Sequence, residues 1–599
     1  MPTSAYPECA LATRVYNAPR ISQPDAGATM RRASVVAAVL VLAAFSLAGC
    51  GSSALPTPTQ RATTPATPTA AGLTETATLV PTFTATATAT ATATPTPTPT
   101  PTPLPPSLWS QVGVPEALRL LAVEGNEVIP ATGSESAEAR LGLTEEPTAA
   151  EWVLVPVVPF PTLADDVAWE DIVAYWQGDA ARLSYLADDS SAPALYCTAP
   201  VFATLVRLLG EPAEGITVNV VKGQEIVDAA WEARPASWAI VPFDELERRW
   251  KALRLDGVSA LEKGLADKSY ALRLYFGIEG PRAAELTLPS FTNRDEEKMT
   301  VLVMTGVTAM AREIGYWMDQ KGVLYPGEYV REPMRAADIA HVSNEIPFAE
   351  NCPPSDFNQE NLVFCSAPSY IDVLRDIGTD VIELTGNHFQ DYGSEATILT
   401  VEMYDKEGWP HYGGGVDLDD ARRPIVMTDH GNSISFMGCN PVGPEYAWAG
   451  EDYPGAAPCD FDYMHGELNR LREEVDVPIV TWQYWEFYFY EPTGEQQEDF
   501  RGMIDAGAKI VSGSQAHHPQ AFEFYNGGFI HYGLGNFFFA QSGTPYTDLE
   551  CLDRHIIYDG RHVSTEVLTY RLIDNSQPQP MTPEDRRQFL SELFAASGW

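Results

Sequence analysis

Positive charge is scarce in this sequence. Lys and Arg number 38 against 81 Asp and Glu in 599 residues, which gives a formal net charge of −43 at pH 7. This balance argues strongly against nucleic acid as a partner and against adhesion to anionic lipids through a basic patch. It also disfavours anionic substrates, except where a metal ion or a local basic cluster overrides the average charge.

Two further absences narrow the possibilities. No Cys-x-x-Cys pair occurs, so a structural zinc site is not indicated. Beyond the apolar run at residues 35–48, no run is long and apolar enough to cross a membrane. About 490 residues follow the low-complexity N-terminal part, which is too many for one core and predicts two or more domains.

An export signal is predicted near the N-terminus. Residues 1–29 carry no signal character and are interpreted as a non-native upstream extension. In 30–50, Met-Arg-Arg leads into the apolar run, and the final Leu-Ala-Gly-Cys resembles the lipobox of bacterial lipoproteins. Cys50 then becomes the lipidated first residue, and the alternatives are an ordinary cleaved signal or an uncleaved anchor. The folded part is expected at the cell membrane, lipid-anchored and facing the extracytoplasmic side.

A spacer follows the predicted anchor. Residues 51–106 are almost entirely Thr, Pro, Ala and Ser, a composition that cannot build a core. In polyproline II at about 3.1 Å per residue, such a linker reaches on the order of 150 Å from the lipid. A purely disordered tail is the alternative, with the same physical consequence.

Six cysteines lie after Cys50, an even number in a chain expected to be exported, and this favours disulfides. Cys352 with Cys365 and Cys439 with Cys459 are close in sequence and lie in loop-like, Pro-rich segments. These two pairs are therefore predicted to be disulfides. The last two cysteines, Cys197 and Cys551, lie in different folded units and are expected to stay free.

The first folded unit is predicted at 107–293. Short apolar strands such as 152–158 alternate with amphipathic segments such as 169–176, which is typical of an α/β domain. The order of the segments 158–166, 176–178 and 239–246 resembles periplasmic solute-binding proteins. An ordinary core with turns, and no ligand, is the equally weighted alternative.

The second folded unit is predicted at 294–599. The apolar strand 299–306 runs into a Gly turn and a helical segment at 309–318. Strands and helices then alternate, among them a strand at 381–384 and a helix at 496–506. This alternation predicts an α/β sandwich whose loops carry the polar residues.

Five motifs of the second unit occur in a fixed order. They are 336–347, 384–393, 413–424, 504–513 followed by Ala516-His517, and 530–538. In order and spacing they are similar to the CapA family, the bacterial poly-γ-glutamate capsule-synthesis proteins. The resemblance covers roughly residues 299–539 and implies a calcineurin-like metallophosphoesterase fold.

The residue types in these motifs point to a metal site. Asn387 and His388 follow the strand 381–384, at the carboxyl end where α/β sheets place ligands, and Asp391 lies one turn later. Glu345 offers a carboxylate and His517 an imidazole from two other loops. Mixed carboxylate, imidazole and amide ligands suit Mn²⁺, Zn²⁺ or Fe, and such ions activate water in hydrolases.

Departures from the family pattern weaken the metal site. Where the resemblance implies an Asp ligand, this chain has Val307, which cannot ligate. Gln483 stands in place of one expected His, and Ser514 and Gln515 replace two more. We therefore expect a single weakly held ion or none, in place of a full dinuclear site.

Two functions follow, from different classes. The first is a metal-assisted hydrolase or transferase acting on an anionic capsule or cell-wall polymer. Glu345, His388 and His517 would hold the metal, with Asn387, His388, Asp391 and Gln483 at the reaction centre. The second is a non-catalytic lipoprotein that binds polymer or solute.

Under either function the expected partners are the polymer, the membrane through the lipid anchor, and other capsule-synthesis membrane proteins. The aromatic stretch 482–490 would line a polymer groove, or, as the favoured alternative, form a buried strand and its edge.

Overall fold

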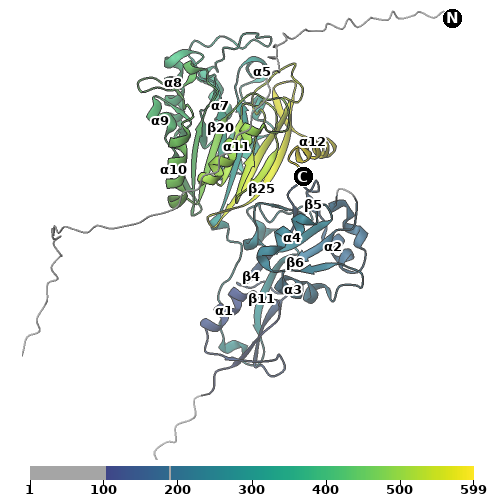
Figure 1. Cartoon of the computed structure of the whole chain (residues 1–599). Helices are drawn as coiled ribbons and strands as arrows, with labels where there is room; N and C mark the ends of the chain where they lie inside the picture. Colours follow the sequence, from purple (N-terminus) through teal and green to yellow (C-terminus); the bar gives the residue numbers. More distant parts are fainter. Residues whose placement is uncertain (1–102, 188–189) are drawn as a thin grey trace, which may run out of the picture. The chain divides into compact units, whose positions relative to one another are not determined.

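The computed structural model of the protein describes residues 103–187 and 190–599, which belong to one compact unit (Figure 1). The predicted export signal, Cys50 and nearly all of the predicted linker lie outside the described residues. None of the described helices is long and apolar enough to cross a membrane.

The front domain is built on a nine-stranded mixed sheet with the order β2-β1-β3-β11-β4-β8-β6-β7, and β9 pairs with β4. The long strand β4 (Glu151–Pro159) is buried along nearly its whole length, as expected for a continuous apolar run in a sheet covered on both faces. The other strands are β1 (Ser107–Ser110), β2 (Ile129–Pro130), β3 (Ala139–Thr144), β6 (Ala194–Cys197), β7 (Val218–Val220), β8 (Ser237–Pro242), β9 (Trp250–Ala252) and β11 (Arg273–Glu279).

Four α-helices accompany this sheet: α1 (Glu116–Glu124), α2 (Trp169–Trp176), α3 (Ala199–Leu209) and α4 (Ile226–Glu232). A separate two-stranded ribbon pairs β5 (Asp166–Val167) with β10 (Arg254–Leu255). The front domain is therefore α/β, as the sequence predicted.

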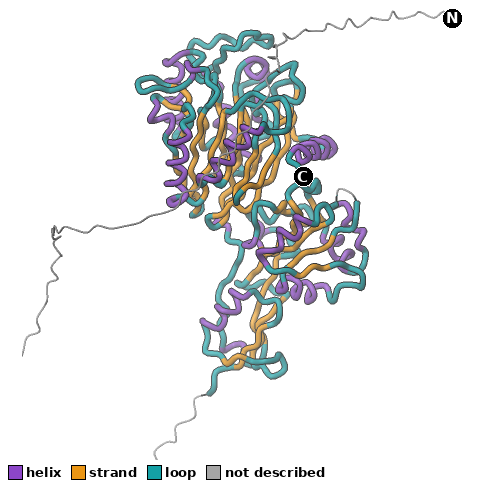
Figure 2. The backbone as a smooth tube through the Cα atoms, viewed as in Figure 1, coloured by secondary structure: helices purple, strands orange, loops and turns teal. Residues whose placement is uncertain are grey.

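The sandwich domain begins at β12 (Met299–Thr308) and contains two large mixed sheets (Figure 2). The first has the order β15-β14-β13-β12-β24-β25-β26 and the second β17-β18-β20-β21-β23-β22. Leu302 and Met304 of the first sheet share a buried cluster with Phe436, Ile479 and Ile510 of the second. The two sheets therefore face each other across one core, which confirms the predicted α/β sandwich.

The strands of the first sheet are β13 (Ile339–Asn344), β14 (Val381–Glu383), β15 (His411–Tyr412), β24 (Leu549–Tyr558), β25 (Arg561–Ile573) and β26 (Gln577–Pro580), besides β12. Those of the second are β17 (Ile425–Asp429), β18 (Asn432–Cys439), β20 (Val477–Gln483), β21 (Ile510–Ser514), β22 (Phe522–Tyr525) and β23 (Gly528–His531). In both sheets the central strands are parallel, since β12, β13 and β14 pair in parallel and so do β18, β20 and β21.

Helices cover the outer face of each sheet. The helices α7 (Ile371–Ile377) and α8 (Gly393–Glu407) bury Leu374 and Tyr404 against the first sheet. The helices α10 (Phe461–Glu474) and α11 (Gly494–Ala506) bury Leu468 and Met503 against the second. Further helices are α5 (Arg312–Lys321), α6 (Arg331–Arg335), α9 (Leu418–Arg422) and α12 (Pro583–Ala596).

The front and sandwich domains share hydrophobic core. The cluster that fills the front domain also contains Met299 and Val301 of β12 together with Ile556 and Tyr558 of β24. The rings of Phe243 and Tyr558 meet edge to face with 4.9 Å between centroids. The contact between the domains is therefore apolar at its centre.

The structure contains disulfides between Cys352 and Cys365 and between Cys439 and Cys459, the same pairs that the sequence predicted. Cys197 and Cys551 are free and buried.

Candidate functional site at the carboxyl ends of the strands

Polar residues of three of the motifs, together with Gln483 of β20, lie where parallel strands of both sheets end. Glu345 follows β13, His388 follows β14, and Gln483 is the last residue of β20. His517 lies three residues beyond β21. We call Glu345, Asn387, His388, Asp391, Gln483 and His517 the carboxyl-end site.

Gln483 links the two sheets at this site. Its amide Nε2 donates to Glu345 Oε1 at 2.9 Å and to Asn387 Oδ1 at 3.2 Å. Its Oε1 accepts from Ser514 Oγ at 2.8 Å. Glu345 and Gln483 are each 1% exposed, so this network satisfies polar atoms that water does not reach.

Close backbone packing brings the β14 loop to Glu345. A Cβ added at Gly386 would lie 2.3 Å from the carbonyl oxygen of Glu345, so only glycine fits there. This glycine precedes Asn387 and His388 directly, and it therefore sets both side chains beside Glu345.

His388 forms a pair with Asp391. Nδ1 of the imidazole lies 2.7 Å from Asp391 Oδ2, and the carboxylate also accepts from the backbone N–H of Phe364 and from Tyr446 Oη. Burial alone lowers the pKa of His388, but the hydrogen bond to Asp391 and the charges of Glu345, Asp391 and Glu486 raise it above its ordinary value. The imidazolium form is thereby favoured.

His517 is held separately. Its Nδ1 lies 2.8 Å from Asn536 Oδ1, and its ring packs on Phe539 with 4.8 Å between centroids. His517 and Gln515 both have positive φ, at 51° and 75°, which is uncommon for residues other than glycine. The turn after β21 is therefore strained at two positions.

A series of ring contacts connects the two imidazoles through Phe364 and Phe539. Phe364 packs on His388 with 4.7 Å between centroids, and Phe364 and Phe539 lie 6.1 Å apart. Both phenyl rings belong to a buried cluster with Val307 and Ile346. Where the resemblance implied a ligand at Val307, the structure has a small hydrophobic core.

The predicted metal ligands do not converge. Among the described residues, the group of three whose ligand atoms all lie within 4.8 Å of one another is Asp338, Asp429 and His430; Glu345, His388 and His517 form no such group. One buried oxygen, Glu345 Oε2, lacks a hydrogen-bond partner, and a phenyl ring packs on each of the two imidazoles. The three predicted ligands are therefore not arranged as the metal centre that the family resemblance implies.

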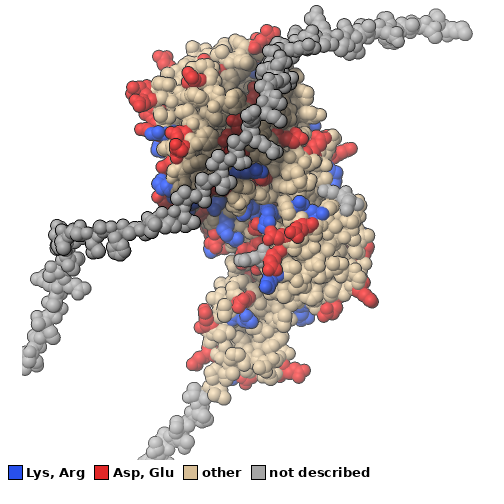
Figure 3. Space-filling view, in the orientation of Figure 1, with Lys and Arg blue, Asp and Glu red and all other residues tan. Residues whose placement is uncertain are grey.

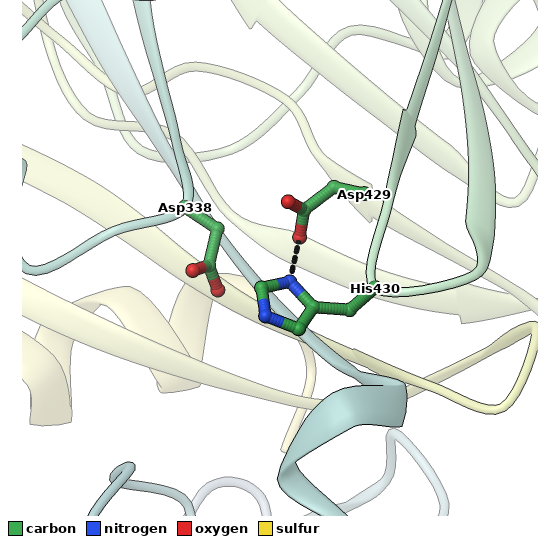
Figure 4. Close-up of side chains that lie close together, drawn as sticks. All are labelled: Asp338, Asp429 and His430. Atoms are coloured by element: carbon green, nitrogen blue, oxygen red, sulfur yellow. Dashed lines mark hydrogen bonds and ion pairs between the residues drawn. The ribbon is translucent and has the colours of Figure 1, made fainter.

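Asp338, Asp429 and His430 lie at the opposite end of the strands, and we call them the amino-end cluster (Figure 4). His430 Nδ1 lies 2.6 Å from Asp429 Oδ2. A cation is already present, since Lys263 Nζ of the front domain lies 2.5 Å from Asp338 Oδ1 and 3.2 Å from His430 Nε2. Sequence reasoning missed this cluster because Lys263 lies 75 residues from Asp338 and in another domain.

The aromatic stretch 482–490 divides in two. Trp482 and Tyr484 are buried at the end of β20, which agrees with the favoured interpretation of a strand. Trp485, Tyr488 and Phe489 are exposed, with 50% of Trp485 accessible. The second half therefore provides the exposed aromatic surface that a polymer groove would need.

Arg312 is a second functional candidate that sequence reasoning missed. It is the first residue of α5, a short loop beyond the end of β12, and its guanidinium lies over the ring of Phe364 at 5.9 Å. It forms a long ion pair with Glu313, with 3.7 Å between Arg312 Nε and Glu313 Oε2, and the buried Nε has no hydrogen-bond partner. A single Arg at a helix start gives no recognisable sequence signal.

Among solved structures, the calcineurin-like phosphoesterase YfkN from Bacillus subtilis is 10% identical, covering 50% of this chain and 98% of that one with a TM-score of 0.30. The 5'-nucleotidase precursor from Thermus thermophilus is 14% identical, covering 50% of this chain and 58% of that one with a TM-score of 0.30. An ABC-type phosphate transport receptor from Vibrio cholerae is 12% identical, covering 29% of this chain and 84% of that one with a TM-score of 0.24. The class defined by the fold itself is an α/β sandwich preceded by an α/β domain.

The sequence comparisons are more specific. Residues 301–541 match the family described as bacterial capsule synthesis protein PGA_cap. The capsule biosynthesis protein CapA of Bacillus anthracis is 24% identical over 295 residues, covering 48% of this chain and 71% of that protein. The PGA biosynthesis protein CapA of Bacillus subtilis (strain 168) is 27% identical over 258 residues, covering 43% of this chain and 67% of that protein. Through this segment the chain is similar to the CapA family, which confirms the resemblance seen in the motifs.

Proposed function

We propose that this protein is a lipid-anchored protein of the cell envelope that binds an anionic poly-γ-glutamate-like capsule polymer at the carboxyl-end site without hydrolysing it. Similarity to the CapA family supports the choice of polymer. The observation that carries the choice of binding over hydrolysis is the apolar cluster of Val307, Phe364 and Phe539 in place of a converging ligand set.

Two cationic side chains beside the carboxyl-end site offer partners for the carboxylates of a polyanion. The Arg312 guanidinium has a weak ion pair and an unpartnered Nε, and the raised pKa of His388 favours its charged form. Both side chains pack on Phe364. Carboxylates of the polymer would pair with these two cations, and its methylene groups would rest on exposed rings such as Trp485.

The test is binding of poly-γ-glutamate to the full chain, followed by the length of the recovered polymer. We expect saturable binding that weakens as salt rises, and no shortening. Arg312→Gln should weaken binding at least tenfold. Arg207→Gln, a matched change at an exposed Arg of α3, should leave it unchanged. Equal affinity of the Arg312→Gln protein and the parent, with unchanged thermal stability, would refute the proposal.

A second candidate function, the metal-assisted hydrolase, is favoured by two observations. Glu345 Oε2 is buried without a partner, and Asp391 orients His388 as carboxylates orient metal-bound imidazoles. The decisive measurement is elemental analysis together with titration of Mn²⁺ and Zn²⁺. Metal-dependent shortening of the polymer that is lost in His388→Ala and increased in Val307→Asp would establish the hydrolase in place of the binding protein.

The anchor is tested separately. Cys50→Ala should release the protein from the membrane fraction, because the predicted lipid is then its attachment. A variant that stays in the membrane fraction as fully as the parent would show that Cys50 is not lipidated.

A further inference from the structure

The structure contains a cavity that is distinct from the carboxyl-end site and shares no residue with it. It has a volume of about 360 Å³ and is lined from the front domain by residues of β9 and β10, and from the sandwich domain by residues of β25, β26 and α12. This volume lies within the range of about 300–1,000 Å³ that is typical of small-molecule sites.

Two cations in the cavity share one carboxylate. Lys251 Nζ lies 2.6 Å from Asp165 Oδ1 and donates to the carbonyl oxygen of Thr162 at 2.8 Å. Arg586 donates to both oxygens of Asp165, at 3.0 Å each, and to the carbonyl oxygen of Val567 at 2.8 Å. Both cations are thus held in place while Asp165 can neutralise only one of them.

The remaining charges leave the cavity positive. Glu566 is engaged by Arg554 in a short ion pair. Arg254 is exposed, and among the described residues its guanidinium has no side-chain or carbonyl partner. Three cationic side chains, Lys251, Arg254 and Arg586, therefore line the cavity against two anionic ones in a chain whose net charge is −43. On the face drawn in Figure 3, Lys and Arg lie mainly in the middle of the view, with Asp and Glu among them.

The surroundings of Lys251 disfavour the charged form of its amine. Burial lowers its pKa to about 8; the attraction of Asp165 opposes this fall, and the nearby charge of Arg586 adds to it. A second anion in the cavity would compensate the excess charge and restore the pKa of Lys251. The geometry therefore has room and charge for one more negative group.

The walls of the cavity are mainly apolar. Phe160, Met581, Leu590 and Phe594 lie along it, so a strongly hydrated ion would leave these surfaces unused. We propose that this cavity binds a small organic carboxylate, with the carboxylate between Lys251 and Arg254 and an apolar body against Phe160 and Leu590.

Calorimetric titration of the full chain at pH 8 tests the proposal with three probes: 3-phenylpropionate, acetate and inorganic phosphate. We expect one site for 3-phenylpropionate, and at least tenfold weaker binding of acetate and of phosphate. Absence of a saturable signal for 3-phenylpropionate would overturn the proposal. Phosphate binding more tightly than the carboxylate would overturn it as well, since the cavity would then be an inorganic anion site.

Variants locate the binding in this cavity. Arg254→Gln removes an exposed cation that has no partner among the described residues, so the fold should be unaffected, and 3-phenylpropionate should bind at least tenfold more weakly. Arg207→Gln, an exposed Arg of the same domain outside the cavity, should change affinity less than twofold. Equal losses in the two variants would refute the assignment.

Proton uptake on binding reports on the charge of Lys251, and a change in packing alone would not alter it. Because the pKa of Lys251 is about 8 and an anion raises it, binding at pH 8 should take up part of a proton, measured as a dependence of the heat on buffer ionisation. Lys251→Met should abolish this uptake. Uptake that persists in Lys251→Met would show that Lys251 is not the group that meets the carboxylate.

Discussion

The two ends of strand β13 carry the same residue types in opposite arrangements. Asp338 precedes the strand, in a group whose carboxylates and imidazole converge, and Lys263 supplies the cation. Glu345 follows the strand, among residues in the family's motif positions that do not converge, and phenyl rings pack on the imidazoles. Suitable ligand types at strand ends are therefore insufficient to define a metal site. The arrangement of the ligands and the side chains packed beside them also matter.

The largest expected effect concerns how the carboxyl-end site is held. Replacing Cys352 and Cys365 together by Ser should lower the free energy of unfolding by about 3 kcal/mol, because a bridge across a sequence separation of 13 restricts the unfolded chain. Phe364, which packs on His388, is the neighbour of Cys365. Urea denaturation measures the loss. A loss under about 1 kcal/mol would mean that packing alone orders this loop.

A somewhat smaller effect is expected at Gln483. Gln483→Leu removes the donor to the buried carboxylate of Glu345 and should destabilise the protein by about 2 kcal/mol. Gln588→Leu on the exposed face of α12 is the matched control and should be nearly neutral. Equal stability of the two variants would show that Glu345 is satisfied without Gln483.

At the amino-end cluster, Lys263→Met should cost about 1 kcal/mol or less, since the ion pair with Asp338 is partly exposed. The same change leaves two carboxylates and an imidazole without their cation, so Zn²⁺ should raise the melting temperature of this variant more than that of the parent. Lys268→Met, at the exposed pair with Glu262, serves as control. A Zn²⁺ response of the parent as large as that of Lys263→Met would show that Lys263 does not block the cluster.

The smallest expected effect is the pH dependence due to His388. Because its pKa is raised in the folded state, its contribution to stability is complete below the unfolded pKa of about 6.5 and is lost as the pH rises through the folded value. His388→Gln should remove this part of the decline when unfolding is measured between about pH 5.5 and 8.5. An unchanged pH profile would show that the pairing of His388 with Asp391 does not contribute to the free energy of unfolding.

Much of the sandwich domain could be predicted because its signals are local. The strand expected at 381–384 is β14 (Val381–Glu383), and the helix expected at 496–506 is α11 (Gly494–Ala506). The five motifs indicated the family, and the parallel strands place their polar residues at one edge.

The details that decide the chemistry were not accessible to the same reasoning. Phe364 and Phe539 are separated by 175 positions and meet only through the fold, as do Lys263 and Asp338. A substitution such as Val307 indicates a lost ligand, but the sequence does not say that aromatic rings fill the space. Hydrophobic contacts of this kind have no spacing rule along the chain.

The core shared between the domains has a practical consequence for anyone who would divide the molecule. A chain cut before Met299 would carry the apolar faces of β12 and β24 into water, since Val301 and Tyr558 pack on the front domain. Such a half would be prone to aggregate, and a failed assay on it would be uninformative about the sandwich domain. The two domains are therefore parts of one compact unit with a shared core, even though each has sheets of its own.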